Sequence, residues 1–324
     1  MSKNRKTKAA TAETNAAGLE TNSAVTETNA PKVETRGVVI IALGHPYFGR
    51  MAHQLALGIK LADPEMQVAL VHNASALTHL APYDLSKTFD RLIAAPEESY
   101  TRNGNREYVK CKTWVYELSP FDRTLLLDAD MIWLPRRTAS ELFDAFGESD
   151  FSAQNHGHVD IADAAEKGYV QWASLKDISE AYGMTTGRYY NVQSECVYFR
   201  KSEAAKALFD AWKHEYENLK VEHRVFAGGV PDELPLAIAL LLTGTHLHET
   251  NFIPVFWQLM RRGVWDEQHL FANFFALSIG GNRSHHHVKM LYDRLASAYF
   301  YRAQLQHPWT QIEKLRFLDE RWKY

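Results

Sequence analysis

The segment that most constrains this chain is an apolar run that ends in two carboxylates, residues 125–133. Three consecutive leucines precede Asp128, and Asp130 follows it after one residue. In an extended strand alternate side chains point to the same side, so both carboxylates can face one point at the end of a buried strand. Such oxygen ligands suit Mg²⁺ or Mn²⁺, with room left for substrate phosphates and water. The segment therefore predicts a divalent-metal site that can hold a nucleotide diphosphate and stabilise it as a leaving group.

Composition sets broad limits on the class of protein. The chain has 324 residues, of which 46% are hydrophobic, enough for one large core or two modest ones. Its formal net charge of −3 gives no overall field that would favour nucleic acid or an anionic membrane. Cys111 and Cys196 have neither metal-ligand spacing nor the pattern of a disulfide framework, which fits a reducing cytosol. No 18-residue apolar run and no signal-peptide core occur, so we expect a cytoplasmic protein without a membrane span.

Residues 1–36 differ from the rest of the chain. They are rich in Ala, Thr, Asn, Glu and Lys, and the triplet Glu-Thr-Asn recurs with a period of seven from Glu13, Glu20 and Glu27. A coiled coil would need two apolar positions in each repeat, and this segment offers one weak position. A segment that buries so little cannot offset its ordering entropy. We therefore expect a disordered, low-complexity tail over residues 1–36.

Four short apolar runs in the first half alternate with helical or turn patterns. Their composition is typical of strands that are buried on both faces. Strands that alternate with helices predict a parallel, wound sheet, which binds ligands beyond the carboxyl ends of its strands. Residues 44–49 are expected to form a loop after the first strand. The expected strands are residues 38–43, 68–71, 91–94 and 124–127, and the expected helices are residues 51–61 and 108–118.

The second half of the chain has a less regular pattern. Residues 155–189 show little periodicity and many polar and aromatic residues, so we expect a loop-rich lid or a segment that faces an acceptor substrate. Ser202 is a plausible N-cap for a helix over residues 202–219. Further expected elements are strands at residues 150–153, 195–199 and 274–279, a helix over residues 231–242, and a helical tail over residues 294–324.

The segment from Lys112 to Asp130 resembles GT-A glycosyltransferases, especially glycosyltransferase family 8, which includes glycogenin. In that family a basic residue lies about sixteen residues before an Asp-x-Asp motif, and a turn and a strand lead to the motif. Lys112 matches the basic position, and Lys110 is a near alternative. The resemblance implies an α/β fold of the GT-A type, a Rossmann-like wound, mostly parallel sheet with flanking helices. It implies a catalytic domain over residues 37–290, followed by a helical C-terminal extension over residues 291–324.

The resemblance implies further roles in chain order. The end of the first strand and its loop embrace the nucleobase in the family. Residues 193–199 align with its Asn-Ser-Gly motif and apolar strand, and residues 232–233 with its Asp-Gln dipeptide, beside sugar and acceptor. A late histidine is its third metal ligand, and a following lysine reaches the phosphates. The implied residues are Ala42, Gly44, Tyr47, Lys112, Asp128, Ala129, Asp130 and Lys289 for the donor, Asp128, Asp130, His285 and His287 for the metal, and Asp232 and Glu233 for catalysis.

Three departures from the family pattern affect these assignments. Glu195 stands where the family has Gly, which alters the sugar pocket. Glu233 stands where it has Gln, so both a retaining and an inverting mechanism stay open. In an inverting reaction Asp232 or Glu233 would deprotonate the acceptor, whereas in a retaining one the leaving phosphate can act as the base. The late histidine and lysine are closer together than in the family, and in an extended segment His285, His287 and Lys289 would share one side.

The activity implied is metal-dependent transfer of a sugar from a UDP-linked donor, such as UDP-glucose, to an acceptor hydroxyl with Mn²⁺ or Mg²⁺. The chain is also similar to bacteriophage glycosyltransferases, some of which modify hydroxymethylated DNA bases, so a phage-infected or other bacterial cell is the expected location. An acidic body argues mildly against duplex DNA as the acceptor, although pairs such as Arg136-Arg137 leave it open. The acceptor and the oligomeric state stay open.

Aromatic and polar side chains in the second half are candidates for contacts with substrate. Trp172, Tyr189 and Tyr190 could form an acceptor platform, because sugars and bases both stack on aromatic rings. Asn155 and His156 follow an expected strand end and could reach the sugar.

Two other enzyme activities and one non-catalytic role have weaker support in the sequence. Residues 44–51 faintly resemble the Gly-rich loop and Arg of sugar nucleotidyltransferases, but bulky residues stand where backbone amides must approach phosphate. A phosphatase of the haloacid dehalogenase type would follow Asp-x-Asp with Gly-Thr, and Met131-Ile132 does not fit. A non-catalytic binding module that keeps the fold alone is the remaining alternative.

Overall fold

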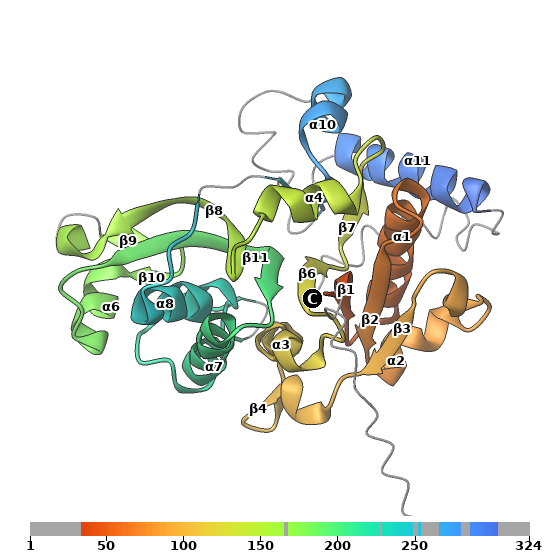
Figure 1. Cartoon of the computed structure of the whole chain (residues 1–324). Coiled ribbons are helices and arrows are strands. Elements are labelled where there is room, and N and C mark those ends of the chain that lie inside the picture. Colours follow the sequence, from red (N-terminus) through yellow and green to blue (C-terminus); the bar gives the residue numbers. More distant parts are fainter. Residues whose placement is uncertain are drawn as a thin grey trace, which may run out of the picture. The chain divides into compact units, whose positions relative to one another are not determined.

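A six-stranded sheet with the strand order β3-β2-β1-β6-β11-β8 lies at the centre of the structure (Figure 1). The computed structural model describes residues 34–164, 168–226, 229–248, 252–253, 266–279 and 286–303. Strands β3, β2, β1 and β6 are parallel, whereas β11 runs antiparallel to both β6 and β8. The strands are β1 (Arg36–Ala42), β2 (Gln67–His72), β3 (Arg91–Ala94), β6 (Arg123–Asp128), β8 (Phe151–Asp160) and β11 (Arg188–Arg200). The expected mostly parallel, wound sheet is confirmed.

The order of the strands places the carboxyl ends of β1 and β6 side by side. The chain runs outward from β1 through β2 to β3 and then returns to the other side of β1 as β6. In the register of this pair Ile41 lies opposite Asp128. Wound sheets bind ligands in the crevice where the strand order reverses in this way. The fold therefore brings the first strand and the acidic strand end to one ligand-binding edge.

The two faces of the sheet bury alternate residues of each strand. Val39 and Leu126 belong to a core under helices α7 (Glu203–Asn218) and α8 (Glu233–Thr243), whereas Ile40 and Leu127 belong to a core under α1 (Pro46–Ala62) and α4 (Ala139–Phe146). Burial of both faces explains why the strands are continuous apolar runs in the sequence. Because side chains alternate along a strand, Asp128 follows Leu126 toward the layer of α7 and α8.

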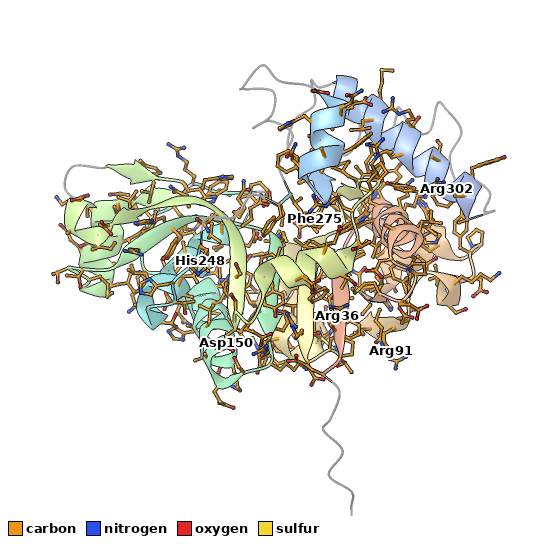
Figure 2. The ribbon with its side chains drawn as sticks, turned by 45° about the horizontal axis from the view of Figure 1, so that its top comes forward. Arg36, Arg91, Asp150, His248, Phe275 and Arg302 are labelled. Carbon is orange, nitrogen blue, oxygen red and sulfur yellow. The ribbon has the colours of Figure 1, made fainter. Side chains whose placement is uncertain are left out.

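A third core joins the C-terminal elements to α1. Strand β7 (Met131–Trp133) pairs antiparallel with β12 (Ala276–Ser278), and α10 (Glu267–Asn273) and α11 (His286–Arg302) lie beside them (Figure 1). Leu277 on β12 and Leu291 on α11 share this core with Leu57 on α1. Phe275, labelled in Figure 2, instead joins the core under α1 and α4, where its ring centroid lies 6.2 Å from that of Trp133. The expected strand over residues 274–279 is therefore short, and it pairs with β7 rather than with the central sheet.

The prediction of a loop-rich segment over residues 155–189 is wrong. Strand β8 continues to Asp160 and pairs with β11, which begins at Arg188. The outer part of β8 exposes alternate residues and contains mostly polar side chains. It therefore lacks the apolar run by which a buried strand is recognised in a sequence. Between these two strands lie η5 (Ile161–Asp163), β9 (Tyr169–Val170), β10 (Ala173–Ser174) and α6 (Leu175–Tyr182).

Two helical predictions need correction. Helix α1 begins at Pro46, five residues earlier than expected, because His45 caps it and proline suits a first turn. Residues 108–118 form a 3₁₀ helix, η4 (Tyr108–Trp114), and then one α-helical turn, α3 (Val115–Leu118). The remaining short elements are α2 (Ala74–Leu77), η1 (Thr78–Leu80), η2 (Leu85–Lys87), η3 (Glu97–Ser99), β4 (Thr101–Arg102) and β5 (Asn105–Arg106).

The predicted boundary at residues 36–37 lies at the start of β1, and the one at residues 290–291 lies inside α11. Strand β1 begins at Arg36, and the predicted tail otherwise lies outside the described residues up to residue 33. Helix α11 runs continuously across residue 290. Within the described ranges, the helices are all too short or too polar to cross a membrane.

His53 on α1 is expected to make stability depend on pH. It is 1% exposed and lies 5.5 Å from the ring of Phe300 on α11, with Nε2 3.1 Å from Thr88 Oγ1. Burial lowers the pKa of His53 from 6.5 to about 4. The unfolded chain therefore binds a proton below about pH 6.5 that the folded chain excludes, and the free energy of unfolding falls as the pH drops toward about 4. Between about pH 7.5 and about pH 5 the wild type should lose about 2 kcal/mol more than a His53→Gln variant, measured by urea unfolding. An equal loss in both proteins would contradict this assignment.

Candidate active site

Lys112 is the centre of a buried cluster at the carboxyl end of β6. Its Nζ lies 2.9 Å from Asp128 Oδ2, 2.8 Å from Asp232 Oδ2 and 3.0 Å from Ser194 Oγ. Ser194 Oγ also donates to the carboxylate of Asp232. Lys112, Ser194 and Asp232 are each less than 9% exposed. The cluster therefore joins residues from four separate segments into one hydrogen-bonded group.

Each member of the cluster is positioned by its own element. Lys112 belongs to η4, and Asp128 ends β6. Ser194 lies where the register between β11 and β8 shifts from Gln193 to Val197, a bulge of the kind that redirects side chains beside active sites. Asp232 precedes the first residue of α8, yet its side chain makes no cap hydrogen bond. Its carboxylate is therefore committed to the cluster rather than to the helix.

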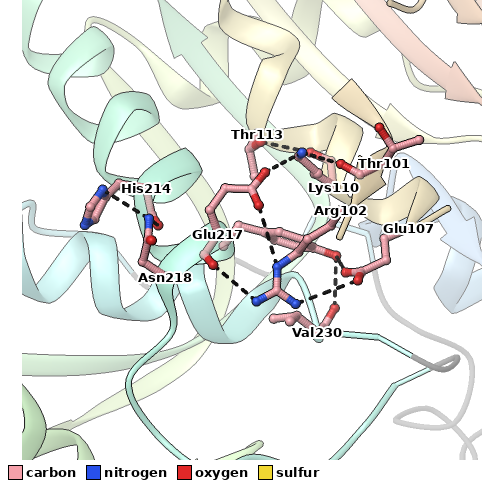
Figure 3. A network of polar contacts seen from close by, with 10 residues as sticks. Thr101, Arg102, Glu107, Lys110, Thr113, His214, Glu217, Asn218 and Val230 are labelled. Atoms are coloured by element: carbon pink, nitrogen blue, oxygen red, sulfur yellow. Dashed lines mark hydrogen bonds and ion pairs between the residues drawn. The ribbon is translucent and has the colours of Figure 1, made fainter. Parts of the chain in front are cut away.

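A second polar network fixes η4 against the approach to α8 (Figure 3). Lys110 Nζ pairs with Glu217 and donates to the carbonyl oxygen of Thr101 at 2.6 Å. Tyr216 OH donates to Glu107 Oε2 at 3.0 Å and lies 3.3 Å from the carbonyl oxygen of Val230. Lys110, the alternative to Lys112, is thus engaged in this network, and Lys112 alone of the two joins the cluster with Asp128.

Burial and charge shift the pKa values of the cluster. Burial by itself would lower the pKa of Lys112, but the charges of Asp128 and Asp232 raise it well above its usual value. Burial raises the pKa of Asp128 to about 7, against the opposing charge of Lys112. Burial also raises the pKa of Glu195 to about 8, and the charge of Asp128 adds to this effect. Glu233 has a pKa well above its usual range because of burial and the charge of Asp232.

Carboxyl groups outnumber cations in this part of the structure. Among the described residues, Lys112 is the cation whose charge reaches Asp128, Glu195 and Glu233. The charge of Asp130 also reaches Asp128, although Asp130 lies in the turn between β6 and β7 rather than in a strand. Such an excess of acid attracts a divalent cation.

The carboxylates fit a metal that is shared with substrate. In the described ranges no three His, Cys, Asp or Glu side chains are close enough to hold a metal ion by themselves. Mg²⁺ is commonly held by one or two carboxylates together with substrate phosphates and water. Asp128 and Asp130 fit that arrangement.

The late histidines are only partly described. His285 lies outside the described residues, and His287 lies on α11, where its side chain is not described. Helix α11 begins at His286, so His287 and Lys289 lie on a helix, and the shared side that an extended segment would give them does not apply. The backbone N–H of Ile279 donates to the carbonyl oxygen of Asp130 at 3.0 Å. The chain therefore leaves β12 beside Asp130, six residues before His285.

The residues expected at the nucleobase lie next to Asp128. Ala42 ends β1, one residue after the partner of Asp128 in the sheet. Gly44 has φ +82°, and an added Cβ would lie 2.6 Å from the ring of Tyr108, so this turn requires glycine. Tyr47 lies in the first turn of α1 rather than in a loop, with its ring 4.3 Å from that of His45. Ala129, between the two aspartates, is buried in the core under α1.

The structure also shows the surroundings of the aromatic and polar residues that were expected to contact substrate. Tyr189 and Tyr190 are 0% and 2% exposed, so they cannot form an open platform. Trp172 packs edge-to-face on Phe226 with ring centroids 5.6 Å apart. Asn155 lies inside β8, not after its end, and donates to the carbonyl oxygen of His248 at 2.7 Å. His156 follows it in the same strand and is exposed.

A cavity of about 250 Å³ lies apart from this cluster. It is lined by the start of β8, the first turn of α7 and residues 245–248, including Asp150 and His248 (Figure 2). None of the candidate site residues lines it. The cluster at the carboxyl end of β6 is therefore the candidate active site on the basis of its side-chain chemistry, not of a cavity.

Ser194 was not among the residues expected in the site. It was visible only as part of the stretch that aligns with the Asn-Ser-Gly motif, where a serine is also compatible with a plain strand position. The bulge that turns it toward Lys112 depends on pairing with β8, a contact between residues about forty positions apart.

Solved structures with the same architecture are glycosyltransferases. The galactosyltransferase LgtC, solved with donor and acceptor sugar analogs, is 12% identical, matches 81% of this chain and 95% of its own, and has a TM-score of 0.50. The bifunctional glycosyltransferase WbbM is 11% identical over 78% of this chain and 47% of its own, with a TM-score of 0.51. GlyE of Streptococcus pneumoniae TIGR4 is 11% identical over 86% of this chain and 66% of its own, with a TM-score of 0.50.

No protein family model matches the chain, and no curated protein matches it in sequence. The structural matches nevertheless have the fold implied by the segment from Lys112 to Asp130. The chain therefore has a GT-A fold, and this expectation is confirmed.

Proposed function

We propose that this protein is a glycosyltransferase that moves a sugar from a UDP-linked donor to an acceptor hydroxyl with the help of Mn²⁺ or Mg²⁺. The observation that carries the proposal is the cluster in which Lys112 joins Asp128, Ser194 and Asp232. It lies where the strand order reverses, at the edge where wound sheets bind nucleotides. The GT-A fold of the chain supports the same assignment.

Each residue has a role in this proposal. The rim formed by Ala42, Gly44 and Tyr47 lies beside the acidic edge and would hold the nucleobase. Asp128 and Asp130, with His285 or His287 as a further ligand, would hold a cation that neutralises charge on the departing diphosphate. Lys112 favours the ionised form of Asp128, orients its carboxylate and would donate to a phosphate oxygen. Lys289 would contact the phosphates from the start of α11.

The acceptor side of the reaction belongs to Asp232 and Glu233. If the reaction inverts, one of them in its carboxylate form would take the proton of the acceptor hydroxyl. The raised pKa of Glu233 makes its ionised form a stronger base than an ordinary carboxylate, and the group must first lose its own proton to act. If the reaction retains configuration, the leaving phosphate would take that proton. The resemblance to phage enzymes suggests a hydroxymethylated base in DNA as one acceptor.

Nucleotidyl transfer has less support than sugar transfer. The segment that faintly resembled a Gly-rich phosphate loop is the first part of α1, from Pro46 onward. A Cβ added at Gly49 would lie 1.9 Å from the carbonyl oxygen of Ala76, so this glycine allows close helix packing. Its backbone is therefore not free to cradle phosphate.

An assay of the whole chain with a panel of nucleotide sugars tests the proposal. The protein is incubated with Mn²⁺ and each donor, alone, with simple sugars, or with DNA that contains hydroxymethylated cytosine. Release of UDP from a UDP-sugar that stops on chelation is the expected result. Pyrophosphate exchange without UDP release would favour a nucleotidyltransferase, and neither reaction with any donor would contradict enzymatic transfer.

A further inference from the structure

The cavity of about 250 Å³ lies at the opposite end of the sheet from the proposed catalytic cluster. One wall is the start of β8, where the N–H of Arg200 donates to the carbonyl oxygen of Asp150 at 2.9 Å. Arg200 pairs with Arg123 at the beginning of β6, whereas the cluster contains Asp128, at the end of β6. Another wall, residues 245–248, follows the C-terminus of α8, whose 11 residues separate it from the cluster by about 15 Å. The cavity is therefore distinct from the candidate active site.

Hydrogen bonds hold the walls of the cavity in place. The N–H of Thr245 donates to a carbonyl oxygen in the last turn of α8 at 3.1 Å. Asn155 Nδ2 donates to the carbonyl oxygen of His248 at 2.7 Å. Ser202 Oγ accepts from the N–H of Ala205 at 3.2 Å and caps α7. A cavity with anchored walls binds a ligand without first ordering the chain, which favours affinity.

The cavity has a buried floor and an exposed polar rim. Phe151, Ser152 and Ala205 are 6%, 7% and 0% exposed. Asp150 and His248, both labelled in Figure 2, are exposed. Among the described residues, the side chains of Asp150 and Ser152 make no hydrogen bond or ion pair. These polar groups are therefore available to a ligand that enters past the rim.

The edge of the sheet adds two backbone groups to the lining. Strand β8 is the last strand in the order of the sheet, so β11 covers only one of its edges. Hydrogen-bonded residue pairs alternate along antiparallel strands. Because Asp150 bonds to Arg200, the next residue, Phe151, directs its N–H and C=O away from β11. A ligand in the cavity can thus meet a backbone donor and a backbone acceptor as well as side chains.

The lining argues against an anion and against a metal ion. Asp150 is a carboxylate, and Glu203 lies in the first turn of α7, where it opposes the attraction of the helix N-terminus for anions. In the described ranges no three His, Cys, Asp or Glu side chains are close enough to hold a metal ion. The other polar groups are hydroxyls, imidazoles and backbone groups, which together donate and accept. They match a neutral ligand with several hydroxyl groups.

The size and the apolar part of the lining narrow the ligand to one ring. The cavity of about 250 Å³ is just below the range of about 300–1,000 Å³ that is typical of sites for drug-sized ligands. Phe151, Ala204 and Ala205 offer carbon atoms beside the polar groups. A sugar ring presents C–H groups and hydroxyls in the same way, whereas an apolar ring would leave the polar groups unpaired.

We propose that this cavity binds one neutral sugar ring as a non-catalytic carbohydrate site. The site adds a second carbohydrate contact to the proposed sugar transfer, and its binding does not depend on that transfer. It lies apart from the donor and from the reacting groups. A ring of about 12 non-hydrogen atoms should bind with a dissociation constant on the order of 1 mM.

The test is a titration of the whole chain with glucose, galactose and mannose, followed by saturation-transfer difference NMR. Ala204→Phe fills the cavity, because Ala204 lines it and is exposed. Ala207→Phe is the matched control, because Ala207 is an exposed alanine on the same helix and is not part of the lining. Asp150→Ala removes the carboxylate and keeps the backbone contact with Arg200. Thermal unfolding checks that each variant is folded.

At least one of the three sugars should bind equally well to the wild type and to Ala207→Phe. It should bind at least about tenfold more weakly to Ala204→Phe, because the added ring occupies the cavity. Asp150→Ala should weaken binding at least about fivefold, through loss of a hydrogen bond to a charged group. Equimolar inorganic phosphate or cyclohexanol should not displace the sugar.

Absence of binding by all three sugars, equal affinity of folded Ala204→Phe and the wild type, or displacement by phosphate or cyclohexanol would overturn the inference. If Ala204→Phe does not fold, unchanged affinity in Asp150→Ala decides against it in the same way. The proposed function is tested separately, because UDP release without added sugar should be the same in Ala204→Phe as in the wild type. Absence of UDP release from the wild type would contradict the transfer and leave the result of the sugar titration valid.

Discussion

Replacement of Asp130 by asparagine should reduce Mn²⁺-dependent release of UDP at least about 1000-fold, a loss of about 4 kcal/mol of transition-state stabilisation. The carboxylate of Asp130 is expected to share the cation with Asp128 and the diphosphate, and an amide is a poorer, neutral ligand. The variant keeps the contact that Asp130 makes with Ile279, because that contact uses the backbone carbonyl. Steady-state kinetics over a range of Mn²⁺ concentrations measures the effect, which should include a weaker apparent affinity for Mn²⁺.

The control for this variant is Asp210→Asn. Asp210 is an exposed aspartate on α7 that pairs with Lys206, and exposed pairs contribute little to stability. Its replacement should leave both turnover and the midpoint of thermal unfolding nearly unchanged. Wild-type turnover by Asp130→Asn would remove this residue from the site, and loss of folding would make it a structural residue.

Replacement of Lys112 by methionine should lower both stability and turnover. Methionine fills a similar volume but leaves the carboxylates of Asp128 and Asp232 buried without their cation. Removing one partner of a buried ion pair commonly costs about 3–5 kcal/mol. Turnover should fall at least about 100-fold as well, because the same ammonium group orients Asp128 and, in the proposed function, would donate to the diphosphate. Urea unfolding and the UDP-release assay measure the two effects separately.

Two further variants separate the roles of charge and position. Adding Asp232→Asn to Lys112→Met removes one of the uncompensated carboxylates and should restore about half of the lost stability without restoring turnover. Lys110→Met removes the other buried lysine of η4, which pairs with Glu217, and should lower stability while turnover stays within about tenfold of wild type. Similar turnover losses in Lys110→Met and Lys112→Met would contradict a special role for Lys112.

The sequence was sufficient to predict the strands in the parallel half of the sheet. Strands β1, β2 and β6 are buried on both faces, so each contains an apolar run that stands out from its neighbours. Strand β3 lies at the edge of the sheet and is largely exposed, yet three of its four residues are apolar. The predicted strand over residues 91–94 coincides with β3. The aspartates at the end of β6 were predictable for the same reason, because three consecutive buried leucines lead directly to Asp128.

The strands of the antiparallel half were harder to predict from the sequence because they are only partly buried. The outer part of β8 alternates exposed and half-buried residues and was mistaken for a loop. Tyr189 and Tyr190 were expected to be available for stacking, yet the pairing of β11 with β8 buries them both. Tertiary pairing, which local pattern does not encode, decided these positions.

Within the site, residue types were more predictable than contacts. The spacing to Asp128 indicated a basic residue at position 110 or 112, and the choice between them depends on the direction of side chains in a 3₁₀ helix. Lys110 and Lys112 lie two residues apart in η4, and only Lys112 reaches Asp128. Asp232 could equally have been a helix cap from sequence, and its contact with Ser194 decides against that role.

A crystal structure with UDP and Mn²⁺, with the metal located by its anomalous signal, tests the central claim most directly. The account predicts one Mn²⁺ within about 2.3 Å of carboxylate oxygens of both Asp128 and Asp130, in contact with the diphosphate of UDP beside Lys112. A cation bound elsewhere, or a diphosphate bound away from the end of β6, would contradict it.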